Sequence, residues 1–254
     1  MPRFLPSLAA AAALVAVSPI ALVACGSDSG NRRVIEITQT NDGCTPATID
    51  LKTGEEVVFK VMNKGDKGRE LEGINGTKLS EVLIPEGRTR NINYYAPSSA
   101  GTAALKCYIP AGNTTVINLN VSGDAKSGDN AAAAADATDH SLKTDKPSAD
   151  TVAVKLVSFE VSTDKPSVAA GPTKFVATNA SKTDVHELAV LRVKDDGSYE
   201  NTGEIEDIEP EKSGEISLDL PAGKYLLSCL IVPGEAGSTA DHFKSGMHLE
   251  FQVK

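Results

Sequence analysis

The feature that most constrains the fold is an internal repeat. FKVMN at 59–63, followed by REL at 69–71, resembles FVATN at 175–179, followed by HEL at 186–188. A second match follows in the same order, because LKCYIPAG at 105–112 resembles LSCLIVPG at 227–234. Chance similarity between β-rich sequences is the alternative. Two matches in one order favour a duplicated domain.

Both halves have the composition of β structure. Short stretches rich in Val, Ile, Thr and Phe are separated by Gly, Pro, Asn and Asp, which is typical of strands and turns. The expected strands of the first half are 34–38, 48–51, 56–63, 78–84, 88–95, 102–108 and 114–121. Those of the second half are 152–161, 167–168, 173–179, 187–193, 214–220, 223–229 and 248–253. Short, regularly spaced strands predict an all-β protein of two sandwich domains.

The N-terminal segment is apolar almost without interruption from Leu8 to Val23. It is short for a membrane-spanning helix and contains Pro19, so an export signal is the better interpretation. The small residues before Cys25 form a lipobox. The resemblance to bacterial lipoproteins implies cleavage before Cys25 and lipidation, for example with palmitate, of that cysteine. A plain secretory signal is the alternative. We expect a lipid-anchored protein on the extracytoplasmic face of the cell membrane, in the periplasm or at the outer surface.

The middle of the chain has the composition of a linker. Gly, Ser, Asp and Lys surround the alanine run 131–135, and no hydrophobic period marks a buried face. A short helix in the alanine run is the alternative. The expected organisation is an export signal at 1–24, a tether at 25–33, a first β domain at 34–122, a flexible linker at 123–150 and a second β domain at 151–254.

Charge and composition exclude one class of partner. The formal net charge is -9, tryptophan is absent and aromatic residues make up 4% of the chain. A nucleic-acid-binding surface needs basic residues for phosphates and aromatic rings for bases, and this composition supplies neither. An acidic surface is suited to steering a basic protein partner.

Cysteine usage points to a special site in the second half. With Cys25 assigned to the lipid, Cys44 and Cys107 lie in the first domain and Cys229 is alone in the second. An unpaired thiol in an exported protein requires a reason. It is buried, paired between molecules or bound to a metal.

The residues after Cys229 favour a metal. His242 and Met247 follow it at the same end of the expected domain, and His186 opens an expected strand. Two imidazoles and one thiolate with a weak axial thioether form the blue-copper arrangement. His248 is the less suitable neighbour, because strand alternation directs its side chain away from that of Met247. His140 lies in the expected linker and is expected to be solvated.

The second domain resembles the cupredoxin family of plastocyanin-like proteins. The resemblance rests on the strand at 175–179, on His186, on the PAGKY turn at 221–225 before Cys229, and on the pair His242 and Met247. It implies a Greek-key β-sandwich that binds one copper ion through His186, Cys229, His242 and Met247. The segment from 230 to 241 is longer than the few residues that family members usually have there.

The first domain resembles the cupredoxin-like domain of bacterial lipoproteins of the elemental-ferrous-iron uptake system. The matched residues are CTP at 44–46, ELE at 70–72 and Cys107 near a Pro-Gly loop. The resemblance implies a metal site formed by Cys44, Cys107, Glu70 and Glu72. A structural disulfide between Cys44 and Cys107 is the alternative that we favour, because the compartment permits it. The helical domain of that family has no counterpart here.

No catalytic motif stands out. The sequence lacks an HExxH metalloprotease signature, a GxSxG elbow and a GxxxxGK[ST] loop. Copper oxidases built from cupredoxin domains need further histidines, and this chain has four in all. We therefore expect a protein that is not an enzyme and that transfers single electrons to or from a membrane redox partner. The alternatives are delivery of copper or iron to a membrane transport protein, and a structural surface module without metal.

Overall fold

The chain is all-β, as predicted. The computed structural model describes residues 32–125 and 142–254, which form strands β1 to β18 and no helix. In this described part no helix has the length and the apolar character that a membrane crossing requires. The expected export signal, the lipidation site Cys25 and the linker residue His140 lie outside the described residues.

Residues of the first half form two facing sheets. One sheet has the strand order β2-β1-β4-β7 and the other has the order β3-β9-β8-β5-β6. The strands are β1 (Arg33–Thr40), β2 (Gly43–Thr45), β3 (Thr48–Lys52), β4 (Glu56–Asn63), β5 (Arg69–Ile74), β6 (Val82–Ile84), β7 (Thr89–Tyr95), β8 (Gly101–Tyr108) and β9 (Thr114–Ser122). We call this part the first sandwich.

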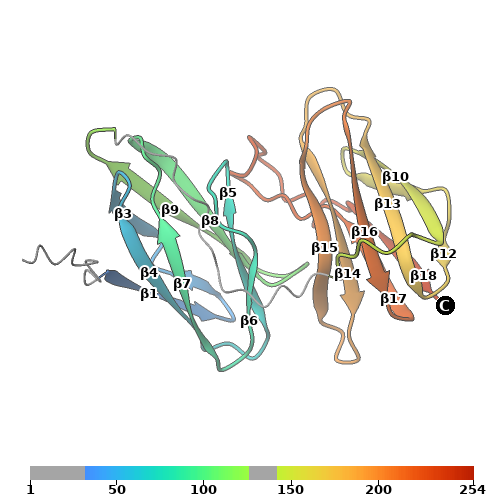
Figure 1. The fold of residues 1–254 in the computed structure, drawn as a ribbon, viewed down its shortest axis with the longest axis horizontal. Coiled ribbons are helices and arrows are strands. Elements are labelled where there is room, and N and C mark those ends of the chain that lie inside the picture. Colours follow the sequence, from blue (N-terminus) through green and yellow to red (C-terminus); the bar gives the residue numbers. More distant parts are fainter. Residues whose placement is uncertain (1–31, 126–141) are drawn as a thin grey trace, which may run out of the picture. The chain divides into compact units, whose positions relative to one another are not determined.

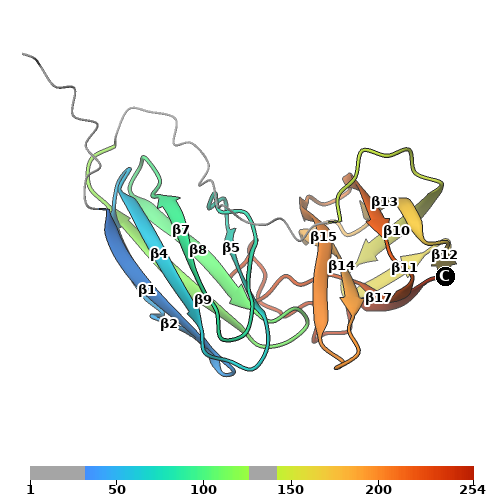
Figure 2. The ribbon, with the colours of Figure 1, turned by 60° about the horizontal axis from the view of Figure 1, so that its bottom comes forward.

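Residues of the second half form another pair of sheets, with the orders β11-β10-β13-β16 and β12-β18-β17-β14-β15. The strands are β10 (Asp150–Val157), β11 (Glu160–Thr163), β12 (Ser167–Val168), β13 (Gly171–Asn179), β14 (His186–Val193), β15 (Tyr199–Ile208), β16 (Ser213–Leu220), β17 (Gly223–Ser228) and β18 (His248–Val253). This part is the second sandwich. Figures 1 and 2 show the two sandwiches in blue to green and in yellow to red.

The two sandwiches share one topology. Each strand of the first has a counterpart in the second, in the same sheet position, when β1 is matched to β10 and β9 to β18. The exceptional parallel pairs also match, because β1 with β4 and β3 with β9 correspond to β10 with β13 and β12 with β18. Four of the seven neighbouring strand pairs in each sandwich are non-consecutive, as in Greek-key sandwiches. This identity of order supports the duplication that the internal repeat predicts.

Strand alternation builds a separate core in each sandwich. In β4 every second residue is buried, which directs Val57, Phe59 and Val61 inward. In β13 the same alternation directs Phe175 and Ala177 into the second core. Burial of large apolar side chains such as these contributes about 1.5–3 kcal/mol each.

Two strands that position the functional residues escape the sequence patterns. Of the strand expected at 78–84, only the part that forms β6 is a strand. The strand before it, β5 (RELEGI), was not predicted. In the second half β15 (YENTGEIEDI) is likewise missed. Both contain glutamates, which are depleted in ordinary strands. The strand expected at 152–161 is also interrupted, because a turn at Ser158 and Phe159 separates β10 from β11.

Part of the segment assigned to the linker pairs with the second sandwich. Leu142 donates its N–H to the carbonyl of Thr202 at 2.7 Å and accepts a hydrogen bond from the N–H of Asp219 at 2.8 Å. Residue Lys143 forms an isolated bridge with Leu218. These described residues are therefore ordered along the second sandwich, whereas residues 126–141 lie outside the described part.

Candidate metal centre

Three of the predicted ligands meet at one end of the second sandwich. Nδ1 of His186 and Nδ1 of His242 are 3.3 Å apart. Sγ of Cys229 lies 3.9 Å from the former nitrogen and 3.3 Å from the latter. All three side chains are buried, and within residues 32–125 and 142–254 Cys229 has no disulfide partner. We refer to these atoms as the donor trio.

The spacing of the donor trio fits one small metal ion. Metal–nitrogen bonds of about 2.0 Å and metal–sulfur bonds of about 2.3 Å in a trigonal plane place two nitrogens about 3.5 Å apart and each nitrogen about 3.7 Å from the sulfur. The observed separations of 3.3, 3.3 and 3.9 Å lie close to these values. The two imidazoles and the thiolate therefore fit an ion without a change of fold.

The fourth predicted ligand is Met247. Its side chain is fully buried in the second core, in the same cluster as Cys229. Its carbonyl accepts a hydrogen bond from the N–H of Cys229 at 3.0 Å, and its N–H donates to the carbonyl of His242 at 3.0 Å. His186, Cys229, His242 and Met247 form a site consistent with one copper ion, for which two imidazoles, a thiolate and a weak thioether are the preferred set.

Neighbouring strands bring His186 and Cys229 together. His186 is the first residue of β14, and Cys229 follows the last residue of β17. These strands are antiparallel neighbours with Ala189 opposite Ser228, so their ends meet at the same edge of the sheet (Figure 1). Two ligands distant in sequence are thereby fixed by backbone pairing.

The long segment between Cys229 and His242 closes on itself. Residues 230–241, which we call the ligand loop, begin with buried apolar side chains at Leu230, Ile231 and Val232. The N–H of His242 donates to the carbonyl of Ile231 at 2.9 Å. This bond joins the two ends of the excursion, so its length does not move His242 away from the donor trio.

The outer nitrogens of the two imidazoles differ in their surroundings. Nε2 of His242 lies 3.0 Å from Oγ of Ser238, a residue of the ligand loop. Nε2 of His186 is buried and has no hydrogen-bond partner among the residues that the structure describes. The pair with Ser238 orients the His242 ring so that Nδ1 faces the sulfur, in the manner of contacts that orient metal-bound histidines.

Burial sets the protonation states of the donors. Burial, together with nearby His242, lowers the pKa of His186 to about 4. Burial also lowers the pKa of His242 and raises the pKa of the Cys229 thiol. Both imidazoles are therefore neutral and able to ligate at neutral pH, whereas the thiol must release a proton to a binding metal.

Glu187 is a functional residue that sequence reasoning did not identify. Its backbone N–H donates to Sγ of Cys229 at 3.5 Å, and its Oε1 accepts from the N–H of Leu230 at 2.7 Å. The internal repeat contained a signal, because Glu187 of HEL corresponds to Glu70 of REL.

In the first sandwich the two cysteines form a disulfide. Cys44 and Cys107 are bonded, with their Cα atoms 6.4 Å apart, and both lie in the first core. Nε2 of Gln39 donates to Sγ of Cys107 at 3.3 Å. A metal site in the first sandwich would need these two cysteines as free thiols, and the disulfide removes both.

Glu70 and Glu72 lie apart from that disulfide. On β5, Leu71 is opposite Cys107 and faces the first core, so its two glutamate neighbours point to the other face of the sheet. Glu72 Oε1 lies 2.6 Å from Nζ of Lys106. The structure therefore does not bring the four residues of the proposed first-domain metal site together.

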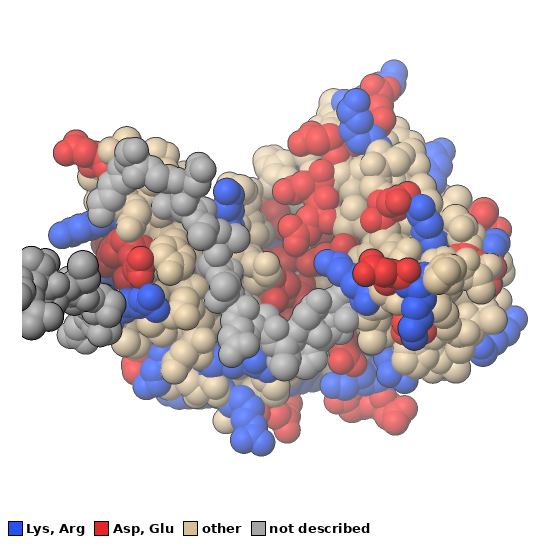
Figure 3. Space-filling model, in the orientation of Figure 1, with Lys and Arg blue, Asp and Glu red and all other residues tan. Residues whose placement is uncertain are grey.

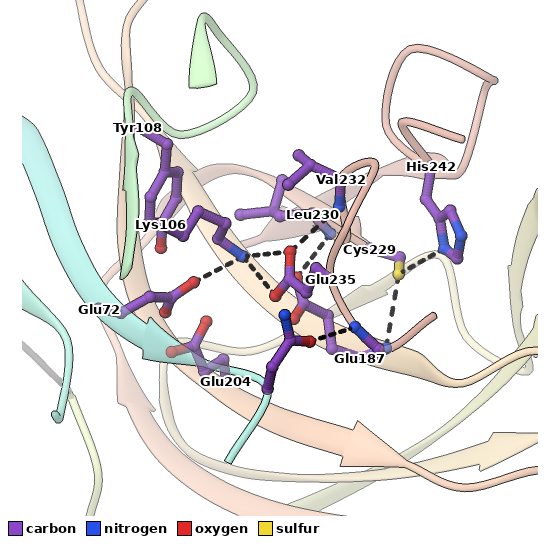
Figure 4. A network of polar contacts seen from close by, with 12 residues as sticks. Glu72, Lys106, Tyr108, Glu187, Glu204, Cys229, Leu230, Val232, Glu235 and His242 are labelled. Atoms are coloured by element: carbon purple, nitrogen blue, oxygen red, sulfur yellow. Dashed lines mark hydrogen bonds and ion pairs between the residues drawn. The ribbon is translucent and has the colours of Figure 1, made fainter. Parts of the chain in front are cut away.

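The carboxylate of Glu72 belongs instead to a buried network. Nζ of Lys106 lies between Glu72 and Glu235, the latter at 3.0 Å (Figure 4). Burial raises the pKa of Glu72, and burial raises the pKa of Glu235 to about 7. Among the described residues, oxygens of Glu72, Glu204 and Glu206 also lie within 4.8 Å of one another.

His248 lies outside the donor trio, as expected from alternation. Its side chain is exposed and stacks on Phe243 with ring centroids 4.6 Å apart, whereas the preceding Met247 is buried.

Residues 8–117 match the family model described as a cupredoxin-like domain. This part of the chain is therefore similar to cupredoxin-like domains. The match ends at Ile117, within β9 of the first sandwich, and the second sandwich repeats the strand order of the first around the donor trio. A search of curated proteins found no match.

Several solved structures resemble the chain at low identity. Reduced auracyanin from Roseiflexus castenholzii is 15% identical, with 42% of this chain and 99% of that chain covered and a TM-score of 0.33. Auracyanin B is 17% identical, with 45% and 95% covered and a TM-score of 0.33. The blue copper oxidase from Nitrosomonas europaea is 12% identical, with 87% and 86% covered and a TM-score of 0.33.

Proposed function

We propose that this chain is an electron-transfer protein that holds one copper ion at His186, Cys229, His242 and Met247. The observation that supports it most directly is the donor trio, whose three atoms are spaced for one trigonal ion. A bound copper ion supplies a one-electron couple between Cu(II) and Cu(I).

Rigidity around the donors suits electron transfer. The N–H of Glu187 fixes the sulfur, and Ser238 fixes the His242 ring. Donors that are already in place need little rearrangement when the charge of the ion changes, which is an advantage for rapid exchange of electrons. Full burial of the three side chains also retains the ion, whereas a delivery protein must release it.

An exposed aromatic residue marks a place for a partner to approach. Phe159 is 39% exposed and packs edge-on against the ring of His242, with centroids 5.3 Å apart. Oγ of Ser158 donates to the carboxylate of Asp184 at 2.5 Å, which ties this turn to the loop before His186. We propose that a membrane redox partner docks over Phe159.

Charge supports a basic partner. The chain has a formal net charge of -9. On the face drawn in Figure 3, acidic and basic side chains are interspersed, and a group of acidic side chains gathers near the centre. An excess of negative charge accelerates the encounter with a basic surface at low ionic strength.

The membrane location is part of the proposal. Its support is the apolar run from Leu8 to Val23 and the lipobox that ends at Cys25. Cell fractionation with mass spectrometry tests it. We expect a lipid on Cys25 in the membrane fraction and a Cys25→Ser variant without lipid. An unmodified cysteine in the wild-type protein contradicts the anchor and leaves the copper site unaffected.

A role in transfer is favoured over catalysis. The four histidines of the chain include the two of the donor trio, so few remain for the further copper centres that an oxidase requires. The resemblance of the first sandwich to an iron-uptake domain stays a prediction, and the disulfide at Cys44 and Cys107 gives it no thiol ligand.

The visible absorption spectrum of the Cu(II)-loaded full chain tests the proposal. We expect an intense thiolate-to-copper band that Cys229→Ser abolishes and that a reductant bleaches reversibly. Ser228→Ala, one residue earlier on β17, is the matched control and should keep the band. A wild-type spectrum without the band, or a band that survives Cys229→Ser, contradicts the ligand assignment.

A further inference from the structure

The ligand loop contacts the first sandwich through Asn75. Nδ2 of Asn75 donates to the carbonyl of Gly234 at 2.8 Å, and Oδ1 of the same amide accepts from the N–H of Ala236 at 2.8 Å. One side chain thus satisfies two backbone groups of a loop 159 residues away in sequence. Asn75 lies in a turn with a φ of 55°, a conformation that asparagine tolerates.

A second contact lies deeper. Lys106 of β8 reaches Glu235 of the ligand loop with Nζ–O distances of 3.0 and 3.3 Å, and its other partner is Glu72 at 2.6 Å. The three side chains are 1%, 6% and 4% exposed. Removing one of these three side chains leaves a buried charge without a partner, which is strongly destabilising. The ion pairs therefore fix the position of Glu235 relative to Lys106.

These contacts continue to the metal ligands. Oε2 of Glu235 accepts from the N–H of Val232 at 3.1 Å, within the same loop. The neighbouring N–H of Leu230 is held by Glu187, whose own N–H reaches Cys229 (Figure 4). Hydrogen bonds therefore hold the stretch from Cys229 to Glu235 on both sides.

Apolar packing accompanies the polar contacts. Tyr108 of β8 belongs to one cluster with Leu230 of the ligand loop and with Ala189 and Leu191 of β14. Both strands are buried on their two faces, because one face serves the core of its own sandwich and the other serves this cluster.

We propose that the first sandwich is a positioning partner of the copper site, with Asn75 and Lys106 as the positioning residues that hold the ligand loop. This inference rests on the proposed function, because it assumes that the loop places His242 beside Cys229 for copper binding. Its basis is that the hydrogen bond between Ile231 and His242 joins only the ends of the loop, whereas the middle, from Gly234 to Ala236, is bound by Asn75 and Lys106.

Asn75→Gly tests the inference without strain, because glycine adopts the positive φ of this turn and removes only the amide. Lys106→Met removes the buried cation, and because it can fail to fold, Asn75→Gly decides the outcome. Lys60→Met, which removes an exposed lysine paired with Glu36 on the first sandwich, is the control. All are made in the full chain.

The first readout needs no metal. In the metal-free protein we expect the amides of residues 230–241 to exchange with deuterium about tenfold faster in Asn75→Gly than in the wild type or in Lys60→Met. In the copper-loaded protein we expect a shifted reduction potential and release of copper to a chelator that is also about tenfold faster.

The outcomes separate the two proposals. Unchanged exchange of the ligand loop in Asn75→Gly overturns the inference, whatever the metal does. Faster exchange together with an unchanged potential and unchanged copper release overturns it as well, because the loop then moves without effect on the site. If the amides of the ligand loop exchange faster in Asn75→Gly but the wild-type protein shows no copper band, the hold on the loop is supported. Only the proposed function is then refuted.

Discussion

Glu187 contacts the chain around Cys229 twice, although the two residues are 42 positions apart in sequence. Its N–H donates to the Cys229 sulfur at 3.5 Å, and its carboxylate accepts from the N–H of Leu230 at 2.7 Å. Hydrogen bonding around a cysteine sulfur tunes the reduction potential of a copper site. With copper bound, a negative charge on this buried carboxylate would stabilise Cu(II) relative to Cu(I).

Glu187→Gln should raise the reduction potential. The amide keeps an acceptor for Leu230 but removes the negative charge, and we expect a rise on the order of 50 mV, or about 1 kcal/mol. Voltammetry of the copper-loaded chain measures it. Glu215→Gln, which removes the same charge from an exposed ion pair with Lys174, should leave the potential nearly unchanged. A lower potential in Glu187→Gln is the result that contradicts this role.

Copper affinity should increase with pH by about one decade per unit between pH 7 and 8. Burial raises the pKa of the Cys229 thiol, so the thiol is protonated throughout this range and releases one proton on binding. Burial lowers the pKa of His186 to about 4 and also lowers the pKa of His242, so the imidazoles add no further proton.

Competition with a chelator of known protonation measures this slope. A slope of two or more decades per pH unit would show that an imidazole is also protonated before binding. In Cys229→Ser the slope should fall toward zero, because a serine hydroxyl does not release its proton in this range.

The sequence predicts the ligands because they follow a short linear order. Cys229, His242 and Met247 occur in succession, and the internal repeat indicates the place of His186. Backbone pairing of β14 with β17 then brings the distant histidine to the cysteine. The fold class is predicted for the same reason, since alternating apolar residues mark the strands of both cores.

The network around Lys106 could not be predicted in this way. Its carboxylates lie on β5, on β15 and in the ligand loop, and a glutamate in a single sequence is interpreted as a surface residue. Only the packing of β8 against the ligand loop removes them from water and pairs Lys106 with Glu72 and Glu235. Such burial depends on contacts between segments that no local pattern records.

The disulfide of the first sandwich should contribute to stability and not to copper binding. The double variant Cys44→Ser/Cys107→Ser opens a link between residues separated by 63 positions, and we expect a loss of about 2–4 kcal/mol in the free energy of unfolding. Chemical denaturation measures this loss. The copper band of the folded variant should be unchanged, and a weakened band would instead assign these cysteines a part in metal binding.

Two equivalent asparagines allow stability to be separated from metal binding. Nδ2 of Asn179 donates to the carbonyls of Asp184 and Ile208, each at 2.8 Å. Nδ2 of Asn63 likewise donates to carbonyls of its own sandwich, those of Lys67 and Ile84, at 2.8 and 2.9 Å. Both side chains are buried, so either alanine variant leaves unsatisfied carbonyls and should cost about 2–4 kcal/mol of stability.

The two variants should differ in copper binding. The loop that Asn179 fixes ends at Asp184, two residues before His186, whereas the loop that Asn63 fixes leads to β5 of the first sandwich. Asn179→Ala should therefore weaken copper binding by roughly tenfold, which corresponds to the net free energy of one or two hydrogen bonds. Asn63→Ala should leave copper binding unchanged. Equal losses of affinity in both would show that copper binding follows overall stability and not the local position of His186.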